Sequence, residues 1–176
     1  YSIATYLGFG ISGAALIIKG VLPAESYAVP ASFMAYTMSL MNVGMLGLDQ
    51  SLLRFYHEPP AGSTGRSMFA ACTRLSVLVM LLAGGIGSIF FAKPLAAAFG
   101  LGASGAGLVP FLFLNAALYM LVRYLNVLLR LENNVRAYTT ETLWMQACLN
   151  LIYLLPGFVT QDARAFVLGA LCSFAG

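Results

Sequence analysis

The chain has 176 residues, of which 60% are hydrophobic and 9% are charged, whereas about 25% of the residues in an ordinary soluble domain are charged. This charge is too little to cover the surface of a soluble domain, and the composition predicts an integral membrane protein. The formal net charge of +3 is scattered and no basic cluster is interleaved with aromatic residues, which excludes a nucleic-acid groove. The 3 cysteines lie far apart in apolar segments, and we interpret them as small hydrophobic side chains.

Apolar runs of about 20 residues, the length that crosses a hydrocarbon core about 30 Å thick, recur along the chain. They predict an all-α, polytopic transmembrane helix bundle of about six spans, because the runs lack the alternation that strands of a β-barrel require. In chain order, the predicted spans are 3–22, 28–48, 67–91, 106–129, 138–159 and 163–176. The last run is still apolar at Gly176, so we expect the sixth span to be incomplete.

The stretch from 44 to 58 is where a long uncharged run meets the densest group of polar side chains. Residues 28–48 carry no charge. The charged and titratable residues that follow within ten positions are Asp49, Arg54, His57 and Glu58. Two consecutive prolines come next, and because Pro-Pro stops a helix while charges are costly in hydrocarbon, we expect a helix that leaves the bilayer and enters a polar loop.

Lys and Arg residues alternate in number between the predicted connections. The first connection has Lys19, the second Arg54, Arg66 and Arg74, the third Lys93, the fourth Arg123, Arg130 and Arg136, and the fifth Arg164. Positive charge favours the cytoplasmic side of a membrane. The second and fourth connections are therefore predicted to be cytoplasmic, together with the N-terminus.

Small and polar residues recur within the predicted spans. The small ones are Gly8, Gly10, Gly13, Gly44, Gly47, Gly84, Gly85 and Gly87, which suit close packing of membrane helices. The polar ones are Ser12, Ser39, Asn42, Asn115, Asn126, Thr140 and Asn150. Two interpretations of the polar residues stay open: they line an aqueous cavity, as in a transporter, or they form hydrogen bonds between helices.

Two sequence motifs match catalytic or nucleotide-binding patterns but lack the structural context that those patterns require. Residues 8–13 spell G-x-G-x-x-G, but no strand precedes them and they lie in a predicted span, so they are interpreted as a helix-packing surface. Residues 102–105 resemble the G-x-S-G of rhomboid proteases, yet the single histidine, His57, is predicted on the opposite side of the membrane from Ser104. With Asp49 and Asp162 also predicted on opposite faces, we expect no enzyme, no metal and no cofactor.

Two stretches resemble a known family. The end of the second predicted span is similar to a G-L-x-x-(A/S)-L-x-R pattern, which is matched by Gly47, Leu48, Ser51, Leu52 and Arg54. The connection at 128–138 is similar to a basic turn before the fifth span of the same proteins. On these motifs the chain resembles the oligosaccharide flippases, Wzx-like polysaccharide-export proteins of the superfamily that includes the MATE drug exporters. Because members have two six-helix lobes, the resemblance implies that residues 1–176 are a single bundle, the N-terminal lobe of a longer transporter.

The resemblance also implies a function. A member of this family moves undecaprenyl-diphosphate-linked oligosaccharide across the bacterial cytoplasmic (inner) membrane for polysaccharide and lipopolysaccharide biosynthesis, by alternating access. The implied partners are the lipid-linked oligosaccharide, membrane lipid, and a second lobe or a second copy of the chain. Cationic side chains in a cavity would pair with the phosphates, and the candidates are Arg123, Arg54, Arg74 and Lys19. Each of these can instead anchor the chain at the interface. Asp49 and Glu141 are candidates for carrying a coupling proton or for an ion pair with one of the arginines.

Three other functions stay open. A small-molecule exporter of the MATE type would move soluble cations instead of a lipid-linked sugar. A non-transport membrane scaffold would keep its function after removal of the intramembrane arginines. A membrane enzyme would need a catalytic cluster that the sequence does not show.

Overall fold

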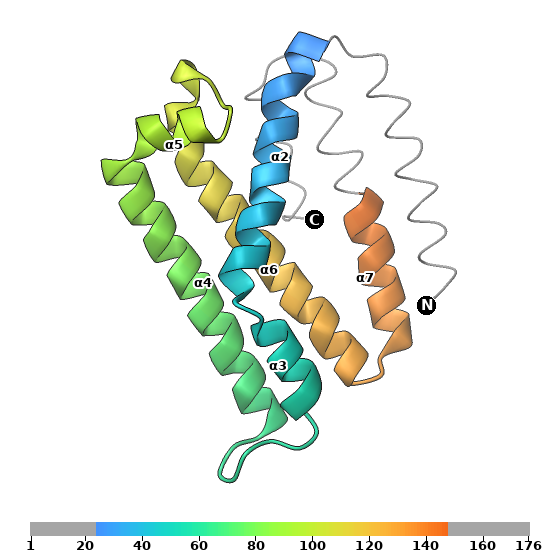
Figure 1. The fold of residues 1–176 in the computed structure, drawn as a ribbon. Coiled ribbons are helices and arrows are strands. Elements are labelled where there is room, and N and C mark those ends of the chain that lie inside the picture. The colour runs from blue at the N-terminus through green and yellow to red at the C-terminus, as the bar shows by residue number, and fades with distance from the viewer. Residues whose placement is uncertain (1–23, 148–176) are drawn as a thin grey trace.

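The computed structural model describes residues 24–147, and this part of the chain is helical without a strand. Its elements are α2 (Ala24–Met45), α3 (Leu48–Phe55), α4 (Gly65–Phe90), α5 (Ala92–Ala98), the 3-10 helix η1 (Ala103–Leu108), α6 (Val109–Leu131) and α7 (Val135–Ala147), as Figure 1 shows. The predicted all-α class is confirmed for these residues. The predicted spans at 3–22 and 163–176 and the candidate Lys19 lie outside them.

Within residues 24–147, two helical segments are long and apolar enough to cross a membrane, namely Gly65–Phe90 and Gly105–Leu131. A third qualifies if the bent pair Ala31–Met45 and Leu48–Phe55 is one span. These segments coincide with the predicted spans at 67–91, 106–129 and 28–48. A fifth predicted span, 138–159, begins within α7 and continues beyond the described residues.

Helix α6 is the centre of the described bundle. It contacts α2, α3, α4, α5, α7 and η1, and it carries most of the core side chains. The helix begins with Pro110 in its first turn, where the missing N–H costs nothing. It ends at Leu131, and Asn133, with a φ of 53°, turns the chain away from the helix. The Asn134 side chain then accepts a hydrogen bond from the Ala137 N–H in the first turn of α7. α6 and α7 are therefore joined by a tight corner.

Helix α4 packs against α6 through one stripe of small and flexible residues. Its buried residues are Ser76, Met80, Gly84 and Gly87, which recur every three or four positions and so share one face of the helix. A Cβ atom built on Gly84 would lie 2.5 Å from the Cβ of Phe113 on α6. The absence of a side chain at Gly84 lets the two backbones approach closely, as is usual for packed membrane helices.

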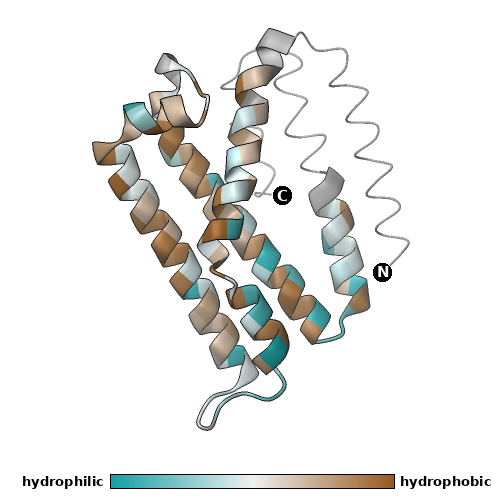
Figure 2. Cartoon of the chain, in the orientation of Figure 1, coloured by the Kyte–Doolittle hydropathy of each residue, from teal (hydrophilic) through white to brown (hydrophobic). Residues whose placement is uncertain are grey.

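The opposite face of α4 is apolar and exposed. Leu78, Leu82, Ile86 and Ile89 are 55%, 56%, 55% and 76% exposed. Figure 2 shows hydrophobic colour along most of α4, and hydrophilic colour concentrates on α3 and the lower part of α6. Because exposed apolar patches of this extent are rare on soluble monomers, the face fits contact with lipid, and a membrane location is plausible for the chain.

The junction after α2 departs from the predicted polar loop. The chain turns at Leu46 and Gly47, whose φ angles are 53° and 71°, and helix α3 then starts at Leu48 with an axis bent by 50°. Asp49 and Arg54 lie on α3, so the polar residues after the apolar run are helical. The loop begins only after Phe55. Leu52 explains this: it is fully buried and ties α3 to the core.

We expect Gly47→Ala to lower the free energy of unfolding by about 1–2 kcal/mol, because an L-residue at this positive φ is strained while nothing within 4 Å crowds an added Cβ. Thermal unfolding in detergent, followed by circular dichroism, would measure this change. Gly107→Ala is the matched control, since that position is equally open and has no positive φ. Equal melting temperatures for the two variants would contradict the bend at Gly47.

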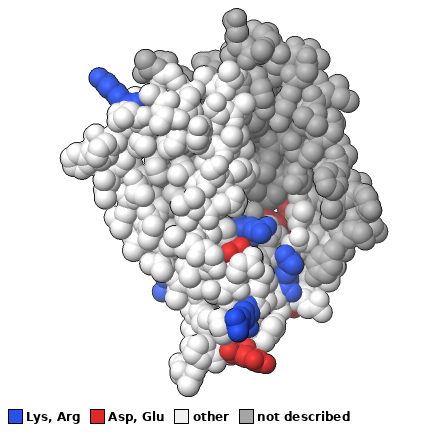
Figure 3. Space-filling model, in the orientation of Figure 1, with Lys and Arg blue, Asp and Glu red and all other residues white. Residues whose placement is uncertain are grey.

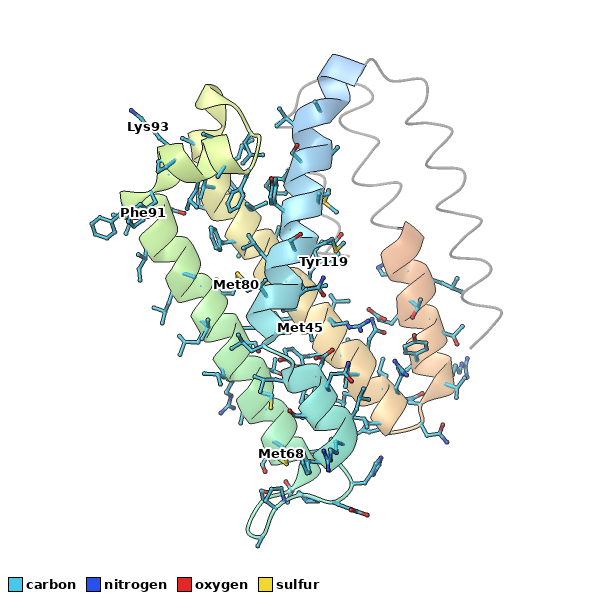
Figure 4. All side chains as sticks on the ribbon, in the orientation of Figure 1. Met45, Met68, Met80, Phe91, Lys93 and Tyr119 are labelled. Atoms are coloured by element: carbon cyan, nitrogen blue, oxygen red, sulfur yellow. The ribbon has the colours of Figure 1, made fainter. Side chains whose placement is uncertain are left out.

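The second and fourth predicted connections meet at one end of the bundle. Arg66 at the start of α4 forms an ion pair of 3.0 Å with Glu132 at the end of α6, and the Tyr56 hydroxyl donates to the same carboxylate oxygen over 3.2 Å. Charged side chains gather on the lower part of the view in Figure 3, whereas Lys93 lies at the other end (Figure 4). We call the end that carries Arg66 and Glu132 the charged end.

Candidate functional site

A polar stripe continues the buried face of α6 toward the charged end. Along this face the residues recur at intervals of three or four: Leu112, Ala116, Tyr119, Arg123, Asn126 and Arg130. Leu112 and Ala116 are fully buried and Tyr119 is 5% exposed, whereas Arg123 and Arg130 are exposed. The face therefore changes from core packing to exposed polar side chains between Tyr119 and Arg123. We define the polar stripe as Arg123, Asn126 and Arg130.

Helix α2 covers the upper part of this face. Asn115 of α6 donates a hydrogen bond of 3.4 Å to the buried Thr37 hydroxyl of α2, and Gly44 packs against Met120. Asn115 and Met120 lie on either side of the line through Ala116 and Tyr119, so α2 packs over this upper part of the face. Helix α2 ends at Met45, one residue after Gly44, and the chain then bends by 50°, so this cover ends near the level of Met120 (Figure 4 labels Met45).

Helix α7 supplies a carboxylate to the same region. Both carboxylate oxygens of Glu141 and the side-chain oxygen of Asn126 are buried, and none of them has a hydrogen-bond partner among the described residues. The two side chains are near one another across the α6–α7 contact. A buried carboxylate with one amide side chain as its polar neighbour is costly, so it is a candidate for binding a proton, a cation or a polar ligand.

An open pocket of about 560 Å³ lies along α7 beside Glu141. Its lining residues are Asn134, Arg136, Ala137, Thr140, Glu141 and Trp144. Trp144 is 53% exposed, and Arg136 lies in the first turn of α7 near the charged end. The surface of this open pocket is mostly apolar, and the Glu141 carboxylate oxygens beside it are themselves buried.

A buried hydrogen bond between α4 and α6 lies next to the start of the polar stripe. The hydroxyls of Ser76 on α4 and Tyr124 on α6 are buried and lie 2.7 Å apart. Arg123 immediately precedes Tyr124, and Asp49 in the first turn of α3 lies within electrostatic range of the Tyr124 hydroxyl. Asp49 also suits the partial positive charge of the α3 N-terminus, which gives it a structural role there.

The remaining predicted phosphate-binding candidates lie elsewhere. Arg54 is exposed in the last turn of α3, with its guanidinium 5.2 Å from the ring centroid of Phe55. Arg74 is exposed on α4, two positions from the buried Ser76 and so on the outer face of that helix. The structure therefore does not bring Arg54 or Arg74 into the polar stripe with Arg123.

No ion pair joins Asp49 or Glu141 to an arginine within residues 24–147. The ion pair that does form there, Arg66–Glu132, was not among the predicted pairs. Asn126, Arg130 and Trp144 were not predicted as site residues. The spacing of Arg123, Asn126 and Arg130 is the sequence signal for the stripe, since these positions share one helical face.

The structure also bears on the rejected catalytic motifs. Ser104 lies in η1, which follows α5, whereas His57 follows α3 at the charged end. The length of α4 separates the two regions, so His57 cannot act as a base for Ser104. In the described part of the chain, no group of three His, Cys, Asp or Glu residues is placed to hold a metal ion. Comparison with known protein families, with curated proteins and with solved structures finds no match for this chain.

Proposed function

We propose that the chain is part of a multi-pass transporter in the bacterial cytoplasmic membrane that moves a lipid-linked oligosaccharide, of the undecaprenyl-diphosphate type, between leaflets. In this proposal the chain forms six spans with a cytoplasmic N-terminus, and a second lobe or second copy completes the pathway. The charged end is cytoplasmic. Transport proceeds by alternating access without covalent chemistry, as in the flippases that the sequence resembles.

The polar stripe on α6 is the observation that carries this proposal. A cationic side chain within a membrane span costs about 2.5–3.5 kcal/mol on insertion scales, and such residues generally face a bundle interior or a cavity. Arg123 lies on the inward face of α6 where α2 no longer covers it, and Glu141 faces the same region from α7. A guanidinium in that position can pair with a diphosphate as the head group crosses the low-dielectric layer.

The experiment that tests the proposal is a flipping assay with the full-length protein in proteoliposomes. A lipid-linked oligosaccharide with a fluorescent head group is incorporated in both leaflets, and a membrane-impermeant reductant is added outside. The flippase hypothesis predicts loss of nearly all the fluorescence, against about half in liposomes without protein, since the outer leaflet holds half of the lipid. If the fluorescence stays near half with folded, correctly inserted protein, the flippase hypothesis is wrong.

The buried Glu141 carboxylate favours a second candidate, an exporter of small cations. The Glu141 carboxylate, whose polar neighbour among the described residues is Asn126, lies beside the exposed Trp144, and an organic cation can bind there through charge and ring contact. Uptake of a cationic dye into the same proteoliposomes distinguishes the two functions. A scaffold would support neither activity.

A further inference from the structure

Arg74 is an isolated cation on the apolar outer face of α4. It shares this face with Leu78 and Leu81, four and seven positions later, which are 55% and 47% exposed. Neither a hydrogen bond nor an ion pair joins Arg74 to another residue between 24 and 147. Its charge therefore has no counter-ion from the described protein, although its neighbours are suited to lipid.

The depth of Arg74 can be obtained from the length of the helix. The 26 residues of α4 extend over about 39 Å at 1.5 Å per residue, which exceeds a hydrocarbon core of about 30 Å. The apolar face ends at Phe91, with Lys93 just beyond it, whereas Met68 lies toward the charged end (Figure 4). Counting back about 20 residues from Phe91 places the other hydrocarbon boundary near Ala71.

Arg74 is then three residues, or about 5 Å, inside that boundary. Side chains on a helix tilt toward its N-terminus, which for α4 is the charged end. The positions one to two turns in that direction hold Ala70, Ala71 and Ser67, whose side chains are small. The arginine stem can lie over these residues and bring the guanidinium to the level of the lipid phosphates.

We propose that Arg74 binds the phosphate of an anionic phospholipid in the leaflet at the charged end. The guanidinium donates a pair of hydrogen bonds to the phosphate oxygens, and the acyl chains lie against Leu78 and Leu81. This site faces away from the polar stripe, because Arg74 lies opposite the residues that contact α6. The proposal requires the membrane location alone and does not depend on the transported substrate.

The test measures which lipids stay bound to the full-length protein. Protein is taken from nanodiscs of equal phosphatidylglycerol and phosphatidylcholine, and the retained lipids are counted by native mass spectrometry. We expect Arg74→Gln to lower the preference for phosphatidylglycerol about fivefold, the effect of one arginine near an anionic surface. Arg74→Lys keeps most of the preference because the charge remains.

Two further variants keep the test decisive. Lys93→Gln removes a positive charge near the opposite end of α4 and should retain phosphatidylglycerol as the parent does. Ala71→Leu leaves Arg74 in place but obstructs its route to the phosphates, so it should lower the preference even if Arg74→Gln yields too little folded protein. An unchanged preference in Arg74→Gln, or in Ala71→Leu when Arg74→Gln does not fold, overturns the proposal. An equal loss in Lys93→Gln also overturns it, because the preference then follows the net charge of the protein and not the position of Arg74.

Discussion

Replacing Gly84 with leucine is expected to separate α4 from α6 and to lower the free energy of unfolding by about 3 kcal/mol. The physical reason is the direct approach of the two helices at this position. An added Cβ would lie 2.9 Å from the Cγ of Phe113 and 2.5 Å from its Cβ, and the Cβ cannot move without the α6 backbone. Thermal unfolding in detergent and the elution profile in size-exclusion chromatography measure the change.

Gly85→Leu is the matched control for this prediction. It places the same side chain one residue later on the same helix, where nothing lies within 4 Å of an added Cβ. A leucine there adds to the exposed apolar face, so its effect on stability should stay within about 0.5 kcal/mol. Similar losses in the two variants would mean that Gly84 does not face α6.

The second large effect is expected from Arg123→Gln in the flipping assay. Removal of a charge-assisted hydrogen bond worth about 1.5–3 kcal/mol should weaken recognition of the diphosphate about 10- to 100-fold. Arg123 is exposed and has no partner in residues 24–147, so the free energy of unfolding should change by less than about 0.5 kcal/mol. Initial flipping rates over a range of substrate densities, measured beside a melting curve, separate the two effects.

Lys93→Gln is the control for charge removal, since Lys93 is exposed at the opposite end of α4. It should flip substrate at the parent rate. Arg123→Lys should recover part of the activity, because it keeps the charge but loses the paired donors of the guanidinium. A parent-like rate in Arg123→Gln would remove Arg123 from the pathway and would favour a scaffold.

Hydropathy was sufficient to predict the long helices. The runs that became α4 and α6 contain enough apolar residues to cross a bilayer, and this property depends only on local composition. The alternation of arginines between the connections predicted that the second and fourth connections share one side. The contact between Arg66 and Glu132 confirms that they meet at one end of the bundle. The side of the membrane on which this end lies stays a prediction.

Hydropathy did not predict α3. The residues after Gly47 are too polar to be predicted as a membrane span, and the two consecutive prolines at 59 and 60 favour a loop. Helix α3 forms because Leu52 is buried against α4 and α6, a contact that depends on the tertiary structure. The left-handed backbone conformation at Leu46 could not be predicted from the sequence either, since leucine rarely adopts a positive φ.

Sequence could not separate Arg123 from Arg74 because each is a single arginine in an apolar run. Their difference lies in what covers each helix face. Arg74 is on the side of α4 opposite the α6 contact, whereas Arg123 continues the face of α6 that α2 covers higher up. Because α2 ends at Met45, Arg123 is exposed on the face that α2 covers higher up, and only the folded arrangement shows this.

The break between α2 and α3 has a consequence for hydration. The N-cap residue of α3 is Gly47, which has no side chain, so no side chain caps the first N–H groups of this helix. The preceding residue, Leu46, is 60% exposed. Backbone groups freed in this way cannot be left in hydrocarbon, where each would cost several kcal/mol. The break is near the level of the Ser76–Tyr124 pair, inside the hydrocarbon boundary estimated at Ala71. If these helices span a membrane, we therefore expect water to enter the bundle from the charged end as far as Gly47 and to solvate Arg123.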